Sequence, residues 1–447
     1  MYNFVIKKIK QVIQRPFVKD LIGLEINAFF YTLIVGIASI LLARFLGRDQ
    51  YGLYVLAFAM AGLLGQVFQL GNSQTLVTLL SEGYGKNSKS EIASAIGWYL
   101  KVNLSTVLPL TVVILFAAGP IAQYVYHKPE LAALARMVIF ASLVSGFLQL
   151  ITTIFQAARH IRALVWVEMS DIFFKKVLMV YAAVAGLGIF WVVFAQLGGA
   201  IIGLLVALFL YGVYRAYDMY LPTFREIRDA VQRTPVTRHL SFDLSIVFER
   251  VINSGFTLLP PLLLGIVASS GDVALFSIAY GYMFLPGIFI TPIARLLSVV
   301  LPQSYQISTD PWKKFLYSGV LSGMIMFFGA LALFIAAPVL IPLLYGERYR
   351  LSVDMARQLF FAAAFVGTGA GFGGMIRALR KNVFFTVLNV IVMILGLGLF
   401  GLYYVLHIQA LTTIVLMVTF WNVIPIFLVY LIMNHWLKGQ KINQQSV

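Results

Sequence analysis

The chain has 447 residues, of which 61% are hydrophobic and 11% are charged, and its mean hydropathy is +0.91. An average soluble domain is about 45–50% apolar and about 25% charged. The composition therefore excludes an ordinary soluble enzyme, a disordered chain and a fibrous protein, and most of the chain must contact lipid. The absence of cysteine excludes disulfides, thiolate metal sites and cysteine nucleophiles.

A helix needs about 20 apolar residues to cross a bilayer, and in lipid only a helix satisfies its own backbone hydrogen bonds along one segment. The sequence predicts twelve such runs, over residues 21–43, 53–80, 92–117, 134–157, 164–187, 190–212, 242–267, 273–302, 314–337, 355–377, 383–405 and 410–433. We therefore expect an all-α polytopic membrane protein with twelve transmembrane helices.

The distribution of Lys and Arg predicts the orientation of these helices. The first run is too long for a signal peptide and has no small-residue cleavage site after it. If the N-terminus is cytoplasmic, the cytoplasmic segments hold 21 Lys and Arg residues and the opposite side holds 7. This bias predicts that both termini are cytoplasmic. It also accounts for the net charge of +16, so we expect no nucleic-acid partner.

The longest polar interruption divides the twelve runs into six plus six. Landmarks of the two halves correspond at an offset of about 218–222 residues, for example Ala118-Gly119-Pro120 with Ala336-Ala337-Pro338, and Arg136 with Arg357. We predict an N-terminal six-helix bundle (1–220), a cytoplasmic linker (221–241) and a C-terminal six-helix bundle (242–447). An even number of spans per half implies a pseudo-two-fold axis along the membrane normal. Two such bundles form a V-shaped protein with a central cavity, an arrangement suited to alternating access.

Charged residues within the predicted spans are the main functional signal. Each costs at least about 2.5–3.5 kcal/mol on insertion scales unless it faces a polar interior or a partner. Apart from residues at span edges, such as Asp243, the nine residues of this kind are Glu25, Lys101, Glu168, Asp171, Lys175, Lys176, Glu249, Arg250 and Arg295. With the N-terminus inside, all lie in the cytoplasmic half or near the middle of a span. We therefore predict a charged vestibule that opens to the cytoplasm.

Four of the cations are candidates for contact with an anionic substrate. Arg295 is the strongest candidate because no acidic residue lies within a helical turn of it, and an Arg fork binds phosphate through two parallel hydrogen bonds. The other candidate substrate-binding residues are Arg250, Lys101 and Lys175. The alternative for Lys175 or Lys176 is neutralisation of Asp171, since Asp171 and Lys175 are spaced i, i+4.

Prolines are concentrated in the seventh and eighth runs. Pro260, Pro261, Pro286 and Pro292 each remove a backbone hydrogen bond and can bend a helix. We interpret them as hinge candidates for a moving gate, with a static kink as the alternative. The glycine-rich string over 369–374 matches a dinucleotide-binding pattern only as letters. We predict that it serves close packing of membrane helices.

Several short motifs resemble a known family. Leu41-Leu42-Ala43-Arg44-Phe45-Leu46-Gly47 followed by Tyr51-Gly52-Leu53-Tyr54, together with Leu301-Pro302-Gln303 and Leu343-Leu344-Tyr345-Gly346-Glu347-Arg348-Tyr349, is similar to segments of bacterial oligosaccharide-lipid (O-antigen-type) flippases. These form the polysaccharide transporter branch of the multidrug/oligosaccharidyl-lipid/polysaccharide exporter (MOP) superfamily. The resemblance implies a V-shaped inner-membrane protein that moves a polyprenyl-diphosphate-linked oligosaccharide from the cytoplasmic to the outer leaflet, for lipopolysaccharide or other cell-surface polysaccharide assembly.

The resemblance also implies roles for the acidic residues and for partners. Glu25, Glu168, Asp171 and Glu249 become candidates for coupling to a proton or sodium gradient. Besides membrane lipids and the lipid-linked oligosaccharide, a polysaccharide polymerase and chain-length proteins are implied as partners. We expect no cofactor other than the coupling ion, and no metal site.

Other functions remain as alternatives with distinct signals. A drug or small-molecule cation antiporter of the multidrug (MATE) type would have the same fold. A major-facilitator carrier also has six plus six spans, but its signature basic loop after the second span is missing. A membrane polymerase or glycosyltransferase needs large outer loops with catalytic acids, which the sequence lacks, so we expect no enzyme. A scaffold would not explain the charges within the spans.

Overall fold

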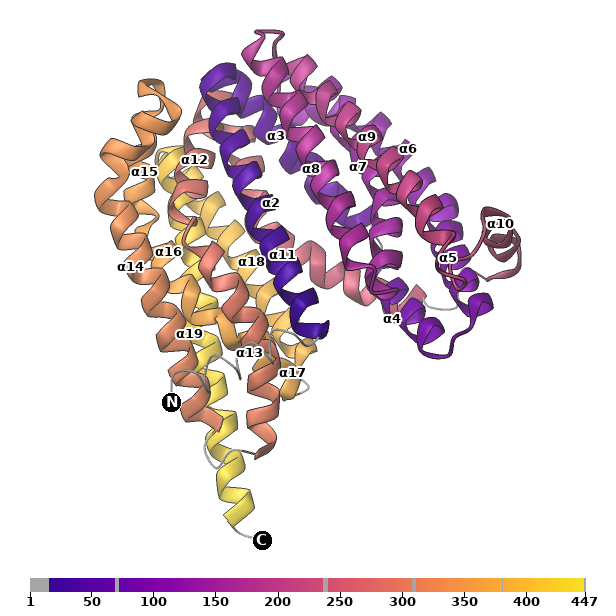
Figure 1. Ribbon diagram of the computed structural model, residues 1–447. Helices are drawn as coiled ribbons and strands as arrows, with labels where there is room; N and C mark the ends of the chain where they lie inside the picture. Colours follow the sequence, from indigo (N-terminus) through magenta and orange to yellow (C-terminus); the bar gives the residue numbers. More distant parts are fainter. Residues whose placement is uncertain (1–15, 69–71, 236–239, 308–310, 380, 446–447) are drawn as a thin grey trace, which may run out of the picture. The chain divides into compact units, whose positions relative to one another are not determined.

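The computed structural model describes the backbone of residues 16–68, 72–235, 240–307, 311–379 and 381–445. For some helix-end residues, among them Glu25 and Asp243, only the backbone is described. Every regular element in these ranges is a helix (Figure 1), which confirms the predicted all-α class.

The described chain divides into two compact units. One unit holds the residues up to Leu46 and those of Met60–Val251, and the other holds Gly47–Ala59 and the residues from Ile252 onward. An ion pair of 2.7 Å between Arg48 and Asp272 fastens the start of helix α3 to the second unit. Close approach of Gly52 to the Ser270 carbonyl, which leaves no room for a side chain, adds to this attachment. The predicted bundles 1–220 and 242–447 with their linker stay a prediction.

Long apolar helices dominate the first unit. Its elements, with α3 and α11 shared with the second unit, are α2 (Pro16–Leu46), α3 (Arg48–Phe68), α4 (Asn72–Gly85), α5 (Lys89–Val102), α6 (Leu108–Pro120), α7 (Glu130–Ala157), α8 (Ile161–Val184), α9 (Ile189–Arg215) and α10 (Phe224–Arg233). A π-helical turn over Asn103–Val107 joins α5 to α6, and a second one over Ile121–Val125 extends α6, so that one span ends at Val125.

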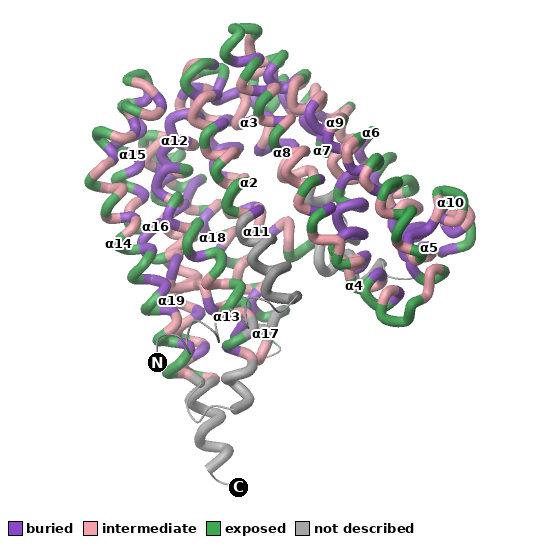
Figure 2. The backbone as a smooth tube through the Cα atoms, in the orientation of Figure 1, coloured by how far each residue is buried: buried purple, intermediate pink, exposed green. Residues whose placement is uncertain are grey.

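The second unit is also built from long helices, several of which are interrupted. Its elements are α11 (Leu240–Val267), α12 (Ser270–Met283), α13 (Gly287–Ile307), α14 (Pro311–Tyr345), α15 (Ser352–Gln358), α16 (Phe360–Val366), α17 (Phe372–Ala378), α18 (Asn382–Val405) and α19 (Ala410–Gln445). Buried, intermediate and exposed residues alternate along these helices (Figure 2), as expected when one side packs on neighbours and the other does not.

Eight helices of the described part are long and apolar enough to cross a membrane, and up to ten if each of two bent pairs forms one span. This confirms a multi-pass membrane protein, although not the predicted number of twelve. The predicted run 164–187 is helical as α8. It carries four charged residues between Glu168 and Lys176, so composition alone does not identify it as a membrane-crossing helix. The predicted run 53–80 falls on α3 and α4, and residues 69–71 between them lie outside the described part.

The predicted hinge prolines occupy two different settings. Pro260 and Pro261 lie inside the uninterrupted helix α11. Pro286 lies in the turn between α12 and α13, which are bent by 55° relative to each other, and Pro292 lies inside α13. A hinge function for these prolines stays a prediction.

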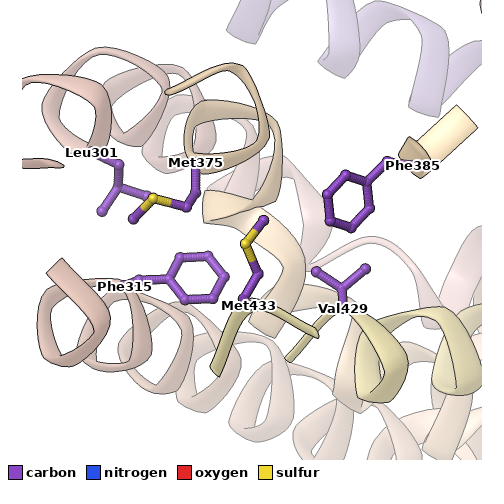
Figure 3. Packing of buried hydrophobic residues seen from close by; sticks show 6 residues of the cluster. All are labelled: Leu301, Phe315, Met375, Phe385, Val429 and Met433. Carbon is purple, nitrogen blue, oxygen red and sulfur yellow. The ribbon is translucent and has the colours of Figure 1, made fainter. Parts of the chain in front are cut away.

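Glycines and a hydrophobic cluster pack the second unit. Side chains from α13, α14, α17, α18 and α19 meet in the cluster shown in Figure 3, which consists of Leu301, Phe315, Met375, Phe385, Val429 and Met433. A Cβ atom at Gly374 would lie 2.7 Å from the Leu297 carbonyl oxygen, so α17 and α13 are in backbone contact there. This contact supports the prediction that the glycine-rich string packs helices, as does Gly371, where a Cβ atom would lie 2.8 Å from the Leu301 side chain.

The predicted linker contains a short amphipathic helix, α10, that packs against α5 (Figure 1). Thr223 and Glu226 form a capping box at its start, and the Lys89 ammonium lies 3.0 Å from the Glu226 carboxylate. The hydrogen bond from the Thr223 backbone N–H and the contact with Lys89 lower the pKa of Glu226. Gly97 of α5 has no side chain, which lets the Ala230 backbone approach closely.

Candidate functional site

Helix α8 carries the main group of ionisable side chains in the first unit. Glu168, Asp171 and Lys175 follow the spacing i, i+3, i+7, which places them on one side of the helix near its middle. Most of the rest of α8 is apolar, and its neighbours α7 and α9 are long enough and apolar enough to cross a membrane. The charged group therefore lies where charge is costly unless it is paired.

Asp171 and Lys175 form a buried ion pair, which the sequence analysis gave as the alternative to a substrate contact for Lys175. The Lys175 ammonium lies 2.7 Å from the Asp171 carboxylate, and the two side chains are only 9% and 17% exposed, respectively. Lys175 also donates a hydrogen bond of 3.0 Å to the Ser145 hydroxyl of α7. A pair with a third polar partner offsets part of the desolvation cost that burial imposes on both ions.

Glu168 has a partner that the sequence analysis did not identify. The Asn27 side-chain amide of α2 donates a hydrogen bond of 2.5 Å to the Glu168 carboxylate. Tyr31, one turn further along α2, lies within electrostatic range of Asp171 and Glu168. A buried Asn on an apolar helix was the available signal, but nothing in the sequence indicated which span faces it.

Two glycines of α9 make the approach to α8 possible. A Cβ atom at Gly199 would lie 2.5 Å from the Lys175 backbone, and one at Gly203 would lie 2.7 Å from Asp171 Oδ1. Gly199 and Gly203 are spaced i, i+4, the small-xxx-small pattern of close membrane-helix packing. The pattern is visible in the sequence and was the overlooked indicator that α9 packs on the charged side of α8.

Some oxygen acceptors in this region lack a donor among the described residues. They are Asn27 Oδ1, Asp171 Oδ1 and, on α9, Gln196 Oε1. Buried acceptors are normally hydrogen-bonded, so each exception needs an explanation. A proton on a carboxylate, or a hard cation, is the kind of group that such oxygens bind.

The other predicted site residues do not share one set of partners. Lys101 donates hydrogen bonds to the Gln232 and Thr234 carbonyls, at 3.3 and 2.8 Å, and thereby holds the end of α10. Arg250 and the exposed Glu249 lie on α11, in the first unit. Arg295 is exposed on α13, in the second unit. The side chain of Glu25 lies outside the described residues. Within the described part, the structure brings together Glu168, Asp171 and Lys175, with Lys176 in electrostatic range of Asp171.

Comparison with solved structures identifies the class to which this fold belongs. The inward-facing conformation of a multidrug resistance MATE family transporter of the MOP superfamily superposes with a TM-score of 0.73 at 16% identity, covering 96% of this chain and 99% of that chain. The lipid II flippase MurJ in its inward closed conformation gives a TM-score of 0.67 at 15% identity, covering 92% of this chain and 87% of that chain. The fold is therefore that of MOP-superfamily membrane transporters and flippases.

A family match makes the assignment more specific. The model of the family described as polysaccharide biosynthesis protein matches residues 26–308, which is more than half of the chain, so the chain belongs to this family. The lipopolysaccharide biosynthesis protein WzxC of Escherichia coli (strain K12) is 21% identical over 392 residues, covering 85% of this chain and 75% of that protein. The predicted resemblance to polysaccharide flippases of the MOP superfamily is confirmed, as is the prediction of a transporter-type protein rather than an enzyme.

Proposed function

We propose that the protein is a flippase that translocates a polyprenyl-diphosphate-linked oligosaccharide from the cytoplasmic to the outer leaflet for cell-surface polysaccharide biosynthesis. Membership of the polysaccharide biosynthesis family supports the substrate class, and the likeness to a lipid II flippase supports a fold able to move such a lipid. The protein lies in the inner membrane with both termini in the cytoplasm, and it works together with a polymerase and chain-length proteins.

The buried group on α8 is the observation that carries a transport function. A helix that only anchors the chain gains nothing from Glu168, Asp171 and Lys175 at mid-span, because their desolvation is costly. A transporter that exchanges a proton or sodium ion across the membrane needs such groups. Glu168 and Asp171 bind the coupling ion, and Lys175 neutralises Asp171 when the ion has left.

The substrate diphosphate is held by cations elsewhere in the chain. Arg295 is the proposed contact for the diphosphate, because an Arg fork matches phosphate geometry better than an ammonium does. Arg250 is a second proposed substrate cation. Lys101 adds a third positive charge near the cytoplasmic linker. Bending at the Pro286 turn accompanies the change of access.

A reconstituted flipping measurement tests this proposal. The purified chain is reconstituted into proteoliposomes with a fluorescent polyprenyl-diphosphate oligosaccharide. The fraction of labelled lipid that reaches the other leaflet is then measured with and without a proton or sodium gradient. We expect gradient-dependent flipping that Asp171→Asn and Arg295→Ala reduce at least tenfold. Arg350→Ala, on an exposed loop, is the matched control and should flip normally. Flipping that Arg295→Ala leaves unchanged would remove Arg295 from the substrate site.

A second candidate function is a MATE-like cation antiporter. The TM-score of 0.73 with a multidrug resistance transporter is the observation that favours it. Efflux of cationic dyes from proteoliposomes, with no flipping of the labelled lipid, would select this alternative over the flippase.

A further inference from the structure

The first unit contains a groove that is separate from the charged group on α8. It lies between α6, α7 and α9 and has a volume of about 520 Å³. Volumes of about 300–1,000 Å³ are typical of small-molecule sites. The residues that form it are apolar except for Arg136, and they include Phe116, Phe140 and Leu197.

Arg136 is held in a fixed position at this groove. Its Nε donates a hydrogen bond of 2.9 Å to the Leu115 carbonyl, and a Cβ atom at Gly119 would lie 2.8 Å from its Nη2. The missing side chain at Gly119 therefore leaves the space in which the guanidinium lies. Of the five guanidinium donors, only the Nε donor has a partner among the described residues.

The surroundings of the groove determine the kind of ligand that reaches it. Phe116 is 75% exposed and Phe140 is 48% exposed, although α7 and the span containing α6 are apolar membrane-crossing helices. Such side chains face lipid. Arg136 lies six residues after the first residue of α7, about 9 Å along the helix, so its guanidinium is near the level of lipid headgroups.

We propose that this groove is a binding site for an anionic phospholipid. One acyl chain lies on the apolar side chains of α6, α7 and α9, and the lipid phosphate accepts hydrogen bonds from the Nη groups of Arg136. An Arg guanidinium and a phosphate form strong, charge-assisted hydrogen bonds. A zwitterionic headgroup also carries a cationic group that Arg136 repels, so the site selects anionic over zwitterionic lipids. On the predicted orientation the lipid belongs to the outer leaflet.

The groove suits a resident lipid better than the transported molecule. A single cation and an apolar lining offer nothing that would bind an oligosaccharide. The repeat-related Arg357 of the second unit provides a contrast, because its guanidinium lies 5.4 Å from the centre of the Phe334 ring and is engaged there. Arg357 is exposed like Arg136, which makes it a matched control.

Native mass spectrometry of the full chain in detergent tests the proposal. Phosphatidylglycerol and phosphatidylcholine with identical acyl chains are added, and the dissociation constant of the first retained lipid is measured. We expect the chain to bind phosphatidylglycerol more tightly than phosphatidylcholine. Arg136→Gln should lose at least fivefold in affinity for phosphatidylglycerol, while Arg357→Gln should bind it as the unsubstituted chain does.

A second variant tests the groove itself. Leu197→Trp fills the groove and keeps Arg136, so it should also weaken phosphatidylglycerol binding. Each variant is compared only if its melting temperature matches that of the unsubstituted chain, and Arg136→Lys replaces Arg136→Gln if the latter does not fold. Equal affinity of Arg136→Gln and the unsubstituted chain would overturn the proposal. Arg136-dependent binding of a polyprenyl diphosphate in preference to phosphatidylglycerol would also overturn it, and would assign the groove to the substrate.

Discussion

Helices α8 and α18 correspond at an offset of 221 residues, within the range predicted for the internal repeat, yet they differ in chemistry. The charged group of α8 consists of Glu168, Asp171 and Lys175. In α18 the equivalent positions hold Asn389, Val392 and Gly396, and α18 contains no charged residue. Two helices that the predicted repeat makes equivalent therefore differ in the charge that they carry.

The helices that follow α8 and α18 along the chain, α9 and α19, also differ in how they pack against them. In the first unit α9 contributes glycines, and the side chains that fill the interface come from α8. In the second unit α18 contributes Gly396, and α19 contributes Trp421, whose indole N–H donates a hydrogen bond of 3.2 Å to the Val392 carbonyl. Phe256 packs edge-on against the same indole.

This difference indicates a division of labour between the two repeats. The first unit contains buried ions, which lower its stability and which the gradient-driven step of our proposal requires. The second unit forms an aromatic interface around Trp421 at the place that the predicted repeat makes equivalent. If the two units differ in this way, substitutions in α8 and at its α18 counterpart have unequal effects.

The largest effect is expected from Asp171→Ala. Removal of one partner of a buried ion pair costs about 3–5 kcal/mol, because Lys175 is left with only the Ser145 hydroxyl. Denaturant unfolding of the detergent-solubilised protein measures the loss. The equivalent variant Val392→Ala should lose less, since it removes only methyl groups. Equal losses of unfolding free energy for Asp171→Ala and Val392→Ala would show that the ion pair on α8 contributes no more than ordinary apolar packing.

Gly199→Ala should destabilise the first unit by about 1–3 kcal/mol, the usual cost of overpacking. Its Cβ atom would lie 2.5 Å from Lys175 backbone atoms, which cannot move independently of α8. The neighbouring Gly198→Ala is the matched control, because its Cβ atom would meet only Leu178 Cδ1 at 4.0 Å. Thermal unfolding compares the two, and a tolerated alanine at both positions would contradict the close contact.

Trp421→Phe should cost about 0.5–1.5 kcal/mol for the lost hydrogen bond to the Val392 carbonyl, in addition to a small packing loss. Unfolding midpoints measure this effect. Because α18 contains no Asp, Glu, Lys, Arg or His residue, the ion dependence of flipping should be the same as in the unsubstituted protein. A shifted ion dependence would mean that the two units do not divide their roles as proposed.

The smallest effect concerns α10 and pH. The pKa of Glu226 is below its ordinary value, so its stabilisation of α10 is complete above the ordinary glutamate pKa and is lost as pH falls through the lowered value. Because the chain has no cysteine, a spin label at Arg228→Cys reports on α10 alone. Its mobility should rise on acidification below pH of about 4, and Glu226→Gln should make this rise smaller. A mobility that does not change with pH would exclude this role of Glu226.

Local features of the sequence predicted which segments are helical and which side chains meet within one helix, but not the breaks within the runs 273–302 and 355–377. Hydropathy predicted the helical segments, since a lipid environment leaves a single chain segment few other ways to satisfy its backbone. The i, i+4 spacing predicted the Asp171–Lys175 pair, because helix geometry alone brings these side chains together. The glycine-rich string in the second unit was correctly assigned to helix packing for a similar reason.

By itself, the sequence determined the class of protein, the family motifs and the residues for which charge would be costly. Only the tertiary structure decided which partners those residues have: Asn27 for Glu168, Ser145 for Lys175, and the end of α10 for Lys101. These partners lie 30 to 141 residues apart along the chain. Helix periodicity fixes which side of a helix a residue occupies, but the neighbour it meets depends on how separate helices pack, and that is set by the summed fit of many weak contacts.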